Sequence, residues 1–71
     1  MHISQWNKIM SAFQDLLGWE KGMNEVVYHK RHMFPNVQIY ELNERQDKVL
    51  TYILRKSYKE LENRKKRKLA S

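Results

Sequence analysis

The sequence predicts a small α+β domain that consists of an N-terminal helix, a β-hairpin and a long C-terminal helix. Residues 3–17 carry apolar side chains at helical spacing, whereas residues 37–40 alternate between apolar and polar as a strand does. Residues 43–69 open with a helix-capping pattern and contain neither proline nor glycine. An all-α arrangement of three helices is the alternative, and the choice depends on the middle of the chain.

The N-terminal helix is indicated by apolar residues that recur every three or four positions, as on a helix face packed against a core. This stripe contains Ile3, Trp6, Met10, Phe13 and Leu17. Gly18 follows it and is expected to adopt the left-handed conformation that ends many helices. Gly22 is expected to close the turn that comes next.

The middle of the chain favours a β-hairpin. Residues 26–28 have strand propensity, and Pro35 lies in a stretch with the composition of a turn. We expect residues 25–32 to pair with residues 37–42, because a strand over 37–42 needs partners for its backbone groups. The rival interpretation is a helix from Asn24 to Met33 that the following proline stops.

The last helix begins with a capping-box pattern, in which Asn43 precedes Gln46 by three residues. An apolar stripe follows and ends at Leu61. A helix of this length would extend about 40 Å, whereas a compact chain of this size is about 28 Å across. We therefore expect a globular domain over residues 1–63 and a basic helical extension or frayed tail over residues 64–71.

The net charge of +6 is concentrated in this last helix. Residues 1–42 carry four basic and four acidic side chains, whereas residues 43–71 carry ten basic and four acidic ones. Such an excess is typical of proteins that bind polyanions. We predict a non-enzymatic nucleic-acid-binding protein with a regulatory or accessory role, with DNA and RNA both open. Phosphate contacts are expected from Arg55, Lys56, Lys59, Arg64, Lys65, Lys66, Arg67 and Lys68.

A second functional interpretation is a protein-binding adaptor or inhibitor that docks on an acidic surface of a larger protein. Aromatic residues and methionine are enriched at the centres of such interfaces. The residues expected to form this interface flank the two predicted turns and are Trp19, Met23, Met33 and Phe34. A homodimer is also open, because a chain this short gains stability from association.

Several other classes of function lack the residues they need. The chain contains no cysteine, and His29 and His32 are separated by two cations, so we expect no metal site and no cofactor. Neither a paired nucleophile and base nor a glycine-rich phosphate loop is present, which argues against an enzyme. The N-terminus lacks the pattern of a signal peptide, and no apolar run has the length of a membrane span, so a cytoplasmic protein is expected.

Overall fold

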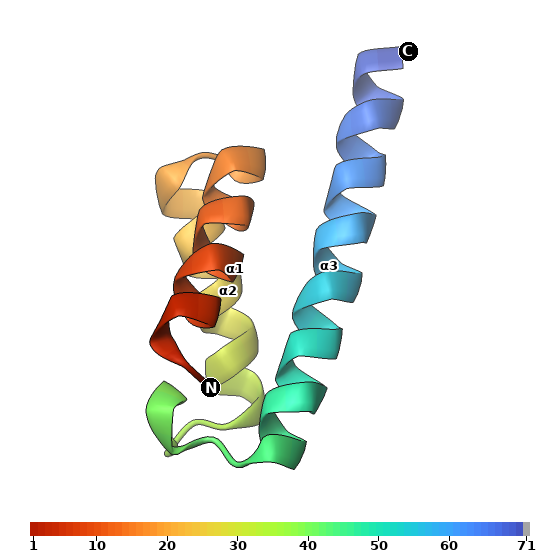
Figure 1. Cartoon of the computed structure of the whole chain (residues 1–71). Coiled ribbons are helices and arrows are strands. Elements are labelled where there is room, and N and C mark those ends of the chain that lie inside the picture. The colour runs from red at the N-terminus through yellow and green to blue at the C-terminus, as the bar shows by residue number, and fades with distance from the viewer. Residues whose placement is uncertain (71) are drawn as a thin grey trace.

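The chain folds into three α-helices and one short 3-10 helix (Figure 1). The computed structural model describes the backbone of residues 1–70 and the side chains of residues 1–68. The elements, in order, are α1 (Ile3–Leu17), α2 (Trp19–Met33), the 3-10 helix η1 (Ile39–Glu41) and α3 (Glu44–Ala70). Residues 1–70 contain no β-strand, so the α+β prediction is wrong and the three-helix alternative matches the structure.

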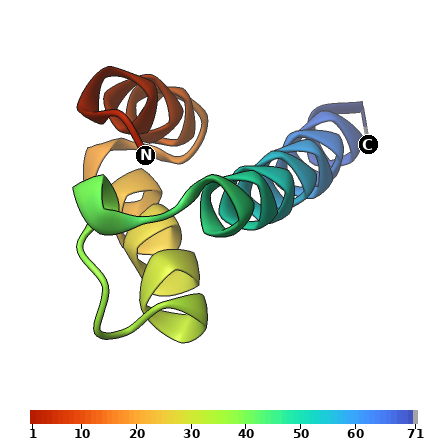
Figure 2. The ribbon, with the colours of Figure 1, turned by 60° about the horizontal axis from the view of Figure 1, so that its bottom comes forward.

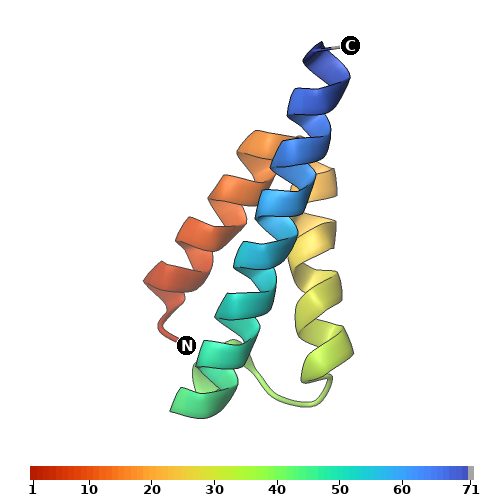
Figure 3. The same cartoon turned by 90° about the vertical axis from the view of Figure 1, so that its right-hand side faces the viewer.

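The helices run up, down and up. α1 and α2 form an antiparallel pair, and α3 returns alongside them in the direction of α1 (Figures 1 and 2). α3 has 27 residues and each of the other two helices has 15. The C-terminal turns of α3 consequently reach past the ends of α1 and α2 (Figure 3). Ser71, the last residue of the predicted basic extension, lies outside the described residues.

The first predicted strand of the hairpin, residues 25–32, instead belongs to the C-terminal half of α2. Its β-branched Val26 is fully buried against the other helices, with 0% of its surface exposed. Burial of such a side chain contributes about 1.5–3 kcal/mol, which exceeds the few tenths by which valine disfavours a helix. The helix ends at Met33, two residues before Pro35, as the rival interpretation expected.

The second predicted strand, residues 37–42, is a connection that contains η1. Its backbone groups find partners without a sheet. The N–H of Glu41 donates to the carbonyl of Gln38 at 2.9 Å, and the N–H of Leu42 donates to that of Ile39 at 3.3 Å. The N-terminal ammonium of Met1 also donates to the Ile39 carbonyl at 2.8 Å. Segment 37–42 therefore does not need a neighbouring strand to provide hydrogen-bonding partners for these backbone groups.

The two glycines have different roles. Gly18 ends α1, which confirms its predicted place, and its φ of 96° is a value that glycine adopts readily. Its ψ of 160° differs from that of the left-handed helix-ending conformation that was expected. Gly22 does not close a turn, because it lies buried inside α2. A Cβ at this position would lie 2.4 Å from the backbone of Gln14 in α1. Glycine at 22 thus permits the close approach of α1 and α2.

The core joins all three helices to the connection before α3. Phe13 from α1 meets the ring of Tyr58 from α3 edge to face, with centroids 5.5 Å apart. The buried apolar residues are Met1, Phe13, Val26, Leu42, Leu50 and Leu54. The core therefore includes the N-terminal half of α3 and stops several turns before its C-terminal end.

Candidate nucleic-acid interface

α3 is held in place by its cap and by its apolar side. The N–H of Gln46 donates to Asn43 Oδ1 at 2.8 Å, and the N–H of Asn43 donates to Gln46 Oε1 at 3.1 Å, which confirms the predicted capping box. Leu50 and Leu54 are fully buried, so they fix the rotation of the helix about its axis. That rotation decides which basic side chains face solvent.

The side of α3 opposite Leu50 is basic. Lys59, for example, lies nine residues after Leu50, which is about 180° around the helix. We call this surface the basic face; its residues are all exposed and are Arg45, Lys48, Tyr52, Arg55, Lys56, Lys59, Asn63, Lys66 and Arg67. Tyr52 projects from its middle with 66% of its surface exposed. At 1.5 Å per residue the basic face is about 33 Å long.

No carboxylate interrupts the basic face among the described side chains. The chain has no acidic residue between Asp47 and Glu60. Two acids pair with cations at the margin of the face: Glu44 lies 3.4 Å from Lys48, and Glu62 lies 3.8 Å from Lys66. Both pairs span one helical turn on an exposed surface, where screening makes such pairs weak. These cations remain able to exchange their partners for phosphates.

The five consecutive basic residues 64–68, which were all predicted to contact phosphates, do not lie on one side of α3. Lys66 and Arg67 continue the basic face, whereas Lys65 lies eleven residues after Leu54 and so points toward the core side. Its Nζ donates to the carbonyl of Leu16 in the last turn of α1, at 3.2 Å. α1 has no basic residue in its own last turn, so Lys65 supplies a cation to that helix end.

The remaining members of the predicted phosphate-binding set divide in the same way. Arg55, Lys56 and Lys59 all lie on the basic face, whereas Arg64 lines a hollow on another side, between α2 and α3. Lys68 is exposed near the C-terminal end of α3. Sequence reasoning did not include Arg45 and Lys48, although the helical spacing from Tyr52 and Arg55 places them on the same face.

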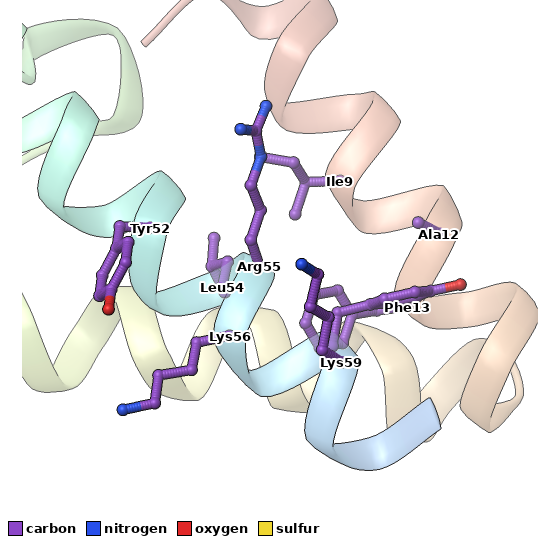
Figure 4. A pocket seen from close by; sticks show the side chains of 9 residues that line it. Ile9, Ala12, Phe13, Tyr52, Leu54, Arg55, Lys56 and Lys59 are labelled. Atoms are coloured by element: carbon purple, nitrogen blue, oxygen red, sulfur yellow. The ribbon is translucent and has the colours of Figure 1, made fainter. Parts of the chain in front are cut away.

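An apolar groove lies beside the basic face, between α1 and α3 (Figure 4). Its volume is about 540 Å³. We call it the α1–α3 groove; its lining residues are Ile9, Ala12, Phe13, Tyr52, Leu54, Arg55, Lys56, Tyr58 and Lys59. The sequence assigned Phe13 and Leu54 to the core, and they are buried there. It gave no indication that their neighbours leave one side of the core open.

The residues predicted for a protein interface do not meet on one surface. Trp19 begins α2 and is 69% exposed, whereas Met33 ends the same helix, about 21 Å away along the axis. Met33 and Phe34 pack against the buried core. Met23 is half-buried, one turn after Trp19. The structure therefore separates the aromatic start of α2 from the apolar residues at its end.

A polar cluster that the sequence reasoning missed joins α2 to α3. His29 Nε2 lies 3.1 Å from Glu25 Oε1 and 3.2 Å from Ser57 Oγ, and Ser57 Oγ lies 3.4 Å from the same carboxylate oxygen. One ring nitrogen contacts both partners, whereas a catalytic relay requires the two ring nitrogens to contact one partner each. The cluster is therefore interpreted as a polar contact that links α2 to α3. The alternative prediction of a helix over residues 24–33 would have placed Glu25 one turn from His29.

His32, the second histidine considered in the sequence analysis, contacts a residue of its own helix. Its ring stacks on that of Tyr28, with centroids 5.9 Å apart. No group of three or more potential metal ligands occurs among the described residues. Over the same part of the chain, no helix combines the length and apolar character that crossing a membrane requires.

Comparisons of the chain with protein-family models, with curated proteins and with solved structures find no match. The site must therefore be interpreted from its own geometry and charge.

Proposed function

We propose that this chain is a non-enzymatic, cytoplasmic nucleic-acid-binding protein with a regulatory or accessory role. In this proposal the basic face of α3 lies along a phosphate backbone. The observation that supports it best is a row of exposed cations about 33 Å long, in which Tyr52 and Asn63 are the only uncharged residues. The carboxylates of Glu44, Glu60 and Glu62 lie at its margins. A solvated helix surface would more commonly mix both charges along its length.

The chemistry of the basic face favours backbone contacts over the reading of base edges. Arg55, Lys56 and Lys59 offer charged donors to phosphate oxygens, and exposed Tyr52, one turn before Arg55 and Lys56, adds a hydroxyl and an aromatic ring. Arginine and lysine can also pair with guanine edges, but Asn63 is the only residue of the basic face with a side chain of the kind that reads the other bases. Binding that depends on charge and varies little with sequence is therefore expected.

Fluorescence anisotropy with labelled duplex DNA and duplex RNA, measured over a series of salt concentrations, tests this proposal. Five or six phosphate contacts predict that log affinity falls with log salt at a slope of about −5, because each contact to duplex DNA contributes about −0.9. We expect similar affinities for unrelated sequences. Absence of binding to both nucleic acids at low salt would refute the proposal.

A matched pair of variants locates the interface. Replacing Arg45 and Lys56 by alanine removes two cations from the basic face, and replacing Lys21 and Arg31 removes two exposed cations from α2. Both variants lose the same charge. The first should reduce the salt slope by about 2, and the second should leave it nearly unchanged. Equal losses would mean that net charge, rather than this face, attracts the nucleic acid.

A further inference from the structure

The α1–α3 groove has a hydrophobic floor and a cationic rim. Phe13 and Leu54 form part of the buried core beneath it, and Ile9, Ala12 and Tyr58 are only half-buried around it. Along α3 the lining runs from Tyr52 to Lys59, about 10 Å or two helical turns. The groove is therefore long enough to receive two apolar side chains from successive turns of another helix.

The charged side chains at the groove have one sign. Arg55 and Lys59 lie on the side of α3 that faces α1, beside Ile9 and Phe13 (Figure 4). Tyr52 and Lys56 also line the groove, but their side chains extend away from α1 in the same view. No carboxylate lines the groove among the described residues. A ligand that places apolar groups on the floor would thus meet two flexible cations at the edge.

We propose that the α1–α3 groove binds an acidic amphipathic helix of a partner protein. Two apolar side chains of that helix, one turn apart, would lie over Ala12 between Ile9 and Tyr58. Aspartate or glutamate residues beside them would pair with Arg55 and Lys59. This is the helix-in-groove mode of recognition, with specificity from the apolar anchors and steering from the charges. It goes beyond nucleic-acid binding, because the ligand and the floor of the site are different.

Other occupants fit the groove less well. A second copy of this chain also carries a net charge of +6, so two copies would bring like charges together. A nucleic-acid base has polar edges that require hydrogen-bonding partners, and the apolar lining side chains Ile9, Ala12, Phe13 and Leu54 offer none. An acidic helix satisfies both the floor and the rim. Charge complementarity and apolar lining therefore point to the same partner.

The probe is a synthetic helical peptide of about four turns, with leucine at positions i, i+3, i+4 and i+7 and glutamate on both sides of that stripe. The control peptide has the same composition in an order that removes the stripe. Binding is measured by anisotropy, and the contact surface by amide chemical-shift changes in the labelled full chain. We expect the striped peptide to bind at least about tenfold more tightly and to shift amides around Ala12 and Leu54.

Two pairs of variants test the floor and the rim separately. Ala12→Leu fills the groove, and Ser11→Leu adds the same group to an exposed neighbouring position of α1. Arg55→Glu with Lys59→Glu reverses the rim, and Lys21→Glu with Arg31→Glu makes the same charge change on α2. The groove variants should each weaken the striped peptide about tenfold or more, and the controls should not. Helical circular dichroism and the melting temperature establish that each variant is folded.

Three results would overturn the proposal. The first is equal affinity for the two peptides, or no binding of either at low salt. The second is self-association of the parent chain that Ala12→Leu abolishes, which would assign the groove to a second copy. The third is loss of nucleic-acid binding in Ala12→Leu but not in Ser11→Leu, which would assign it to the nucleic acid.

Discussion

At Gly22 the backbones of α1 and α2 approach so closely that a Cβ would lie 2.4 Å from both the N and the Cα of Gln14. Real Cβ atoms do not approach backbone atoms to this distance, so a side chain there requires one helix to move. Since Phe13 is the neighbour of Gln14 and is 1% exposed, that movement would also disturb the core.

Gly22→Ala should therefore destabilise the fold, even though alanine is the better helix former. We expect a loss of about 1–3 kcal/mol in the free energy of unfolding, the usual cost of overpacking a core. Urea unfolding followed by circular dichroism measures it. Asn24→Ala, at an exposed position of the same helix, is the control and should change this energy by no more than about 0.5 kcal/mol. Equal effects of the two changes would contradict the close-approach interpretation.

Gly22 was wrongly predicted to lie in a turn, because a local sequence pattern does not show how closely another helix approaches. The place of Gly18 was predicted correctly, since it depends only on the end of an apolar stripe and on its own φ. The same distinction applies to His29. Its contact with Ser57 joins residues that are 28 positions apart, so spacing within α2 could suggest Glu25 as a neighbour but not the serine of α3.

Among the elements, α1 and α3 were predicted from periodicity, and α2 was not. The stripes of α1 and α3 are long and regular, and a capping pair fixes the start of α3. In α2 the valines favour a strand locally, and tertiary burial of Val26 outweighs that preference. The segment 37–42 showed strand alternation, but the Met1 ammonium and η1 satisfy its backbone instead. The burial of Val26 and the Met1 contact depend on segments distant in the sequence, whereas the hydrogen bonds of η1 are local.

The capping box gives a prediction at the scale of α3. Asn43→Ala removes the oxygen that accepts from the Gln46 N–H, and we expect a cost of about 0.5–2 kcal/mol in the free energy of unfolding. Gln46→Ala should cost less, because it removes only the return hydrogen bond to an exposed Asn43. Both are measured by thermal and urea unfolding.

The double variant completes this cycle. Because the two side chains bond to each other's backbone, replacing both should cost less than the sum of the single changes. The unfolding free energy of Asn43→Ala, Gln46→Ala and the double variant provides the comparison. Strict additivity would mean that the two hydrogen bonds stabilise the helix start independently, contrary to a capping box.

At the scale of the whole molecule, the distribution of charge along the chain was predicted from the sequence, but the shape of the surface that carries this charge was not. The excess of cations in residues 43–71 is visible in the sequence, and Arg55, Lys56 and Lys59 were correctly expected to share a helix. The direction in which these side chains point relative to the core was not predicted, because it depends on how Leu50 and Leu54 pack. The α1–α3 groove was missed for a related reason, since helical spacing marks residues as apolar without showing which of them another helix covers.

A comparison of two sides of α3 provides the sharpest whole-molecule test. Residues 64–67 include two cations on the basic face and two on other sides of the helix. Lys66→Gln with Arg67→Gln removes two cations from the basic face. Arg64→Gln with Lys65→Gln removes two from the other sides of the helix, including the donor to Leu16. If the basic face binds phosphates, the first pair should reduce the salt slope for duplex DNA by about 2, and the second should change it much less.

The net charge of the two variants is identical, so a difference in slope can only reflect where the cations lie. The second pair removes the exposed hydrogen bond that Lys65 donates to the end of α1, and this should lower the free energy of unfolding by no more than about 1 kcal/mol. Equal reductions in slope would show that α3 attracts nucleic acid as a charged rod without a preferred side. The core, by fixing the rotation of α3, would then have no part in the interface.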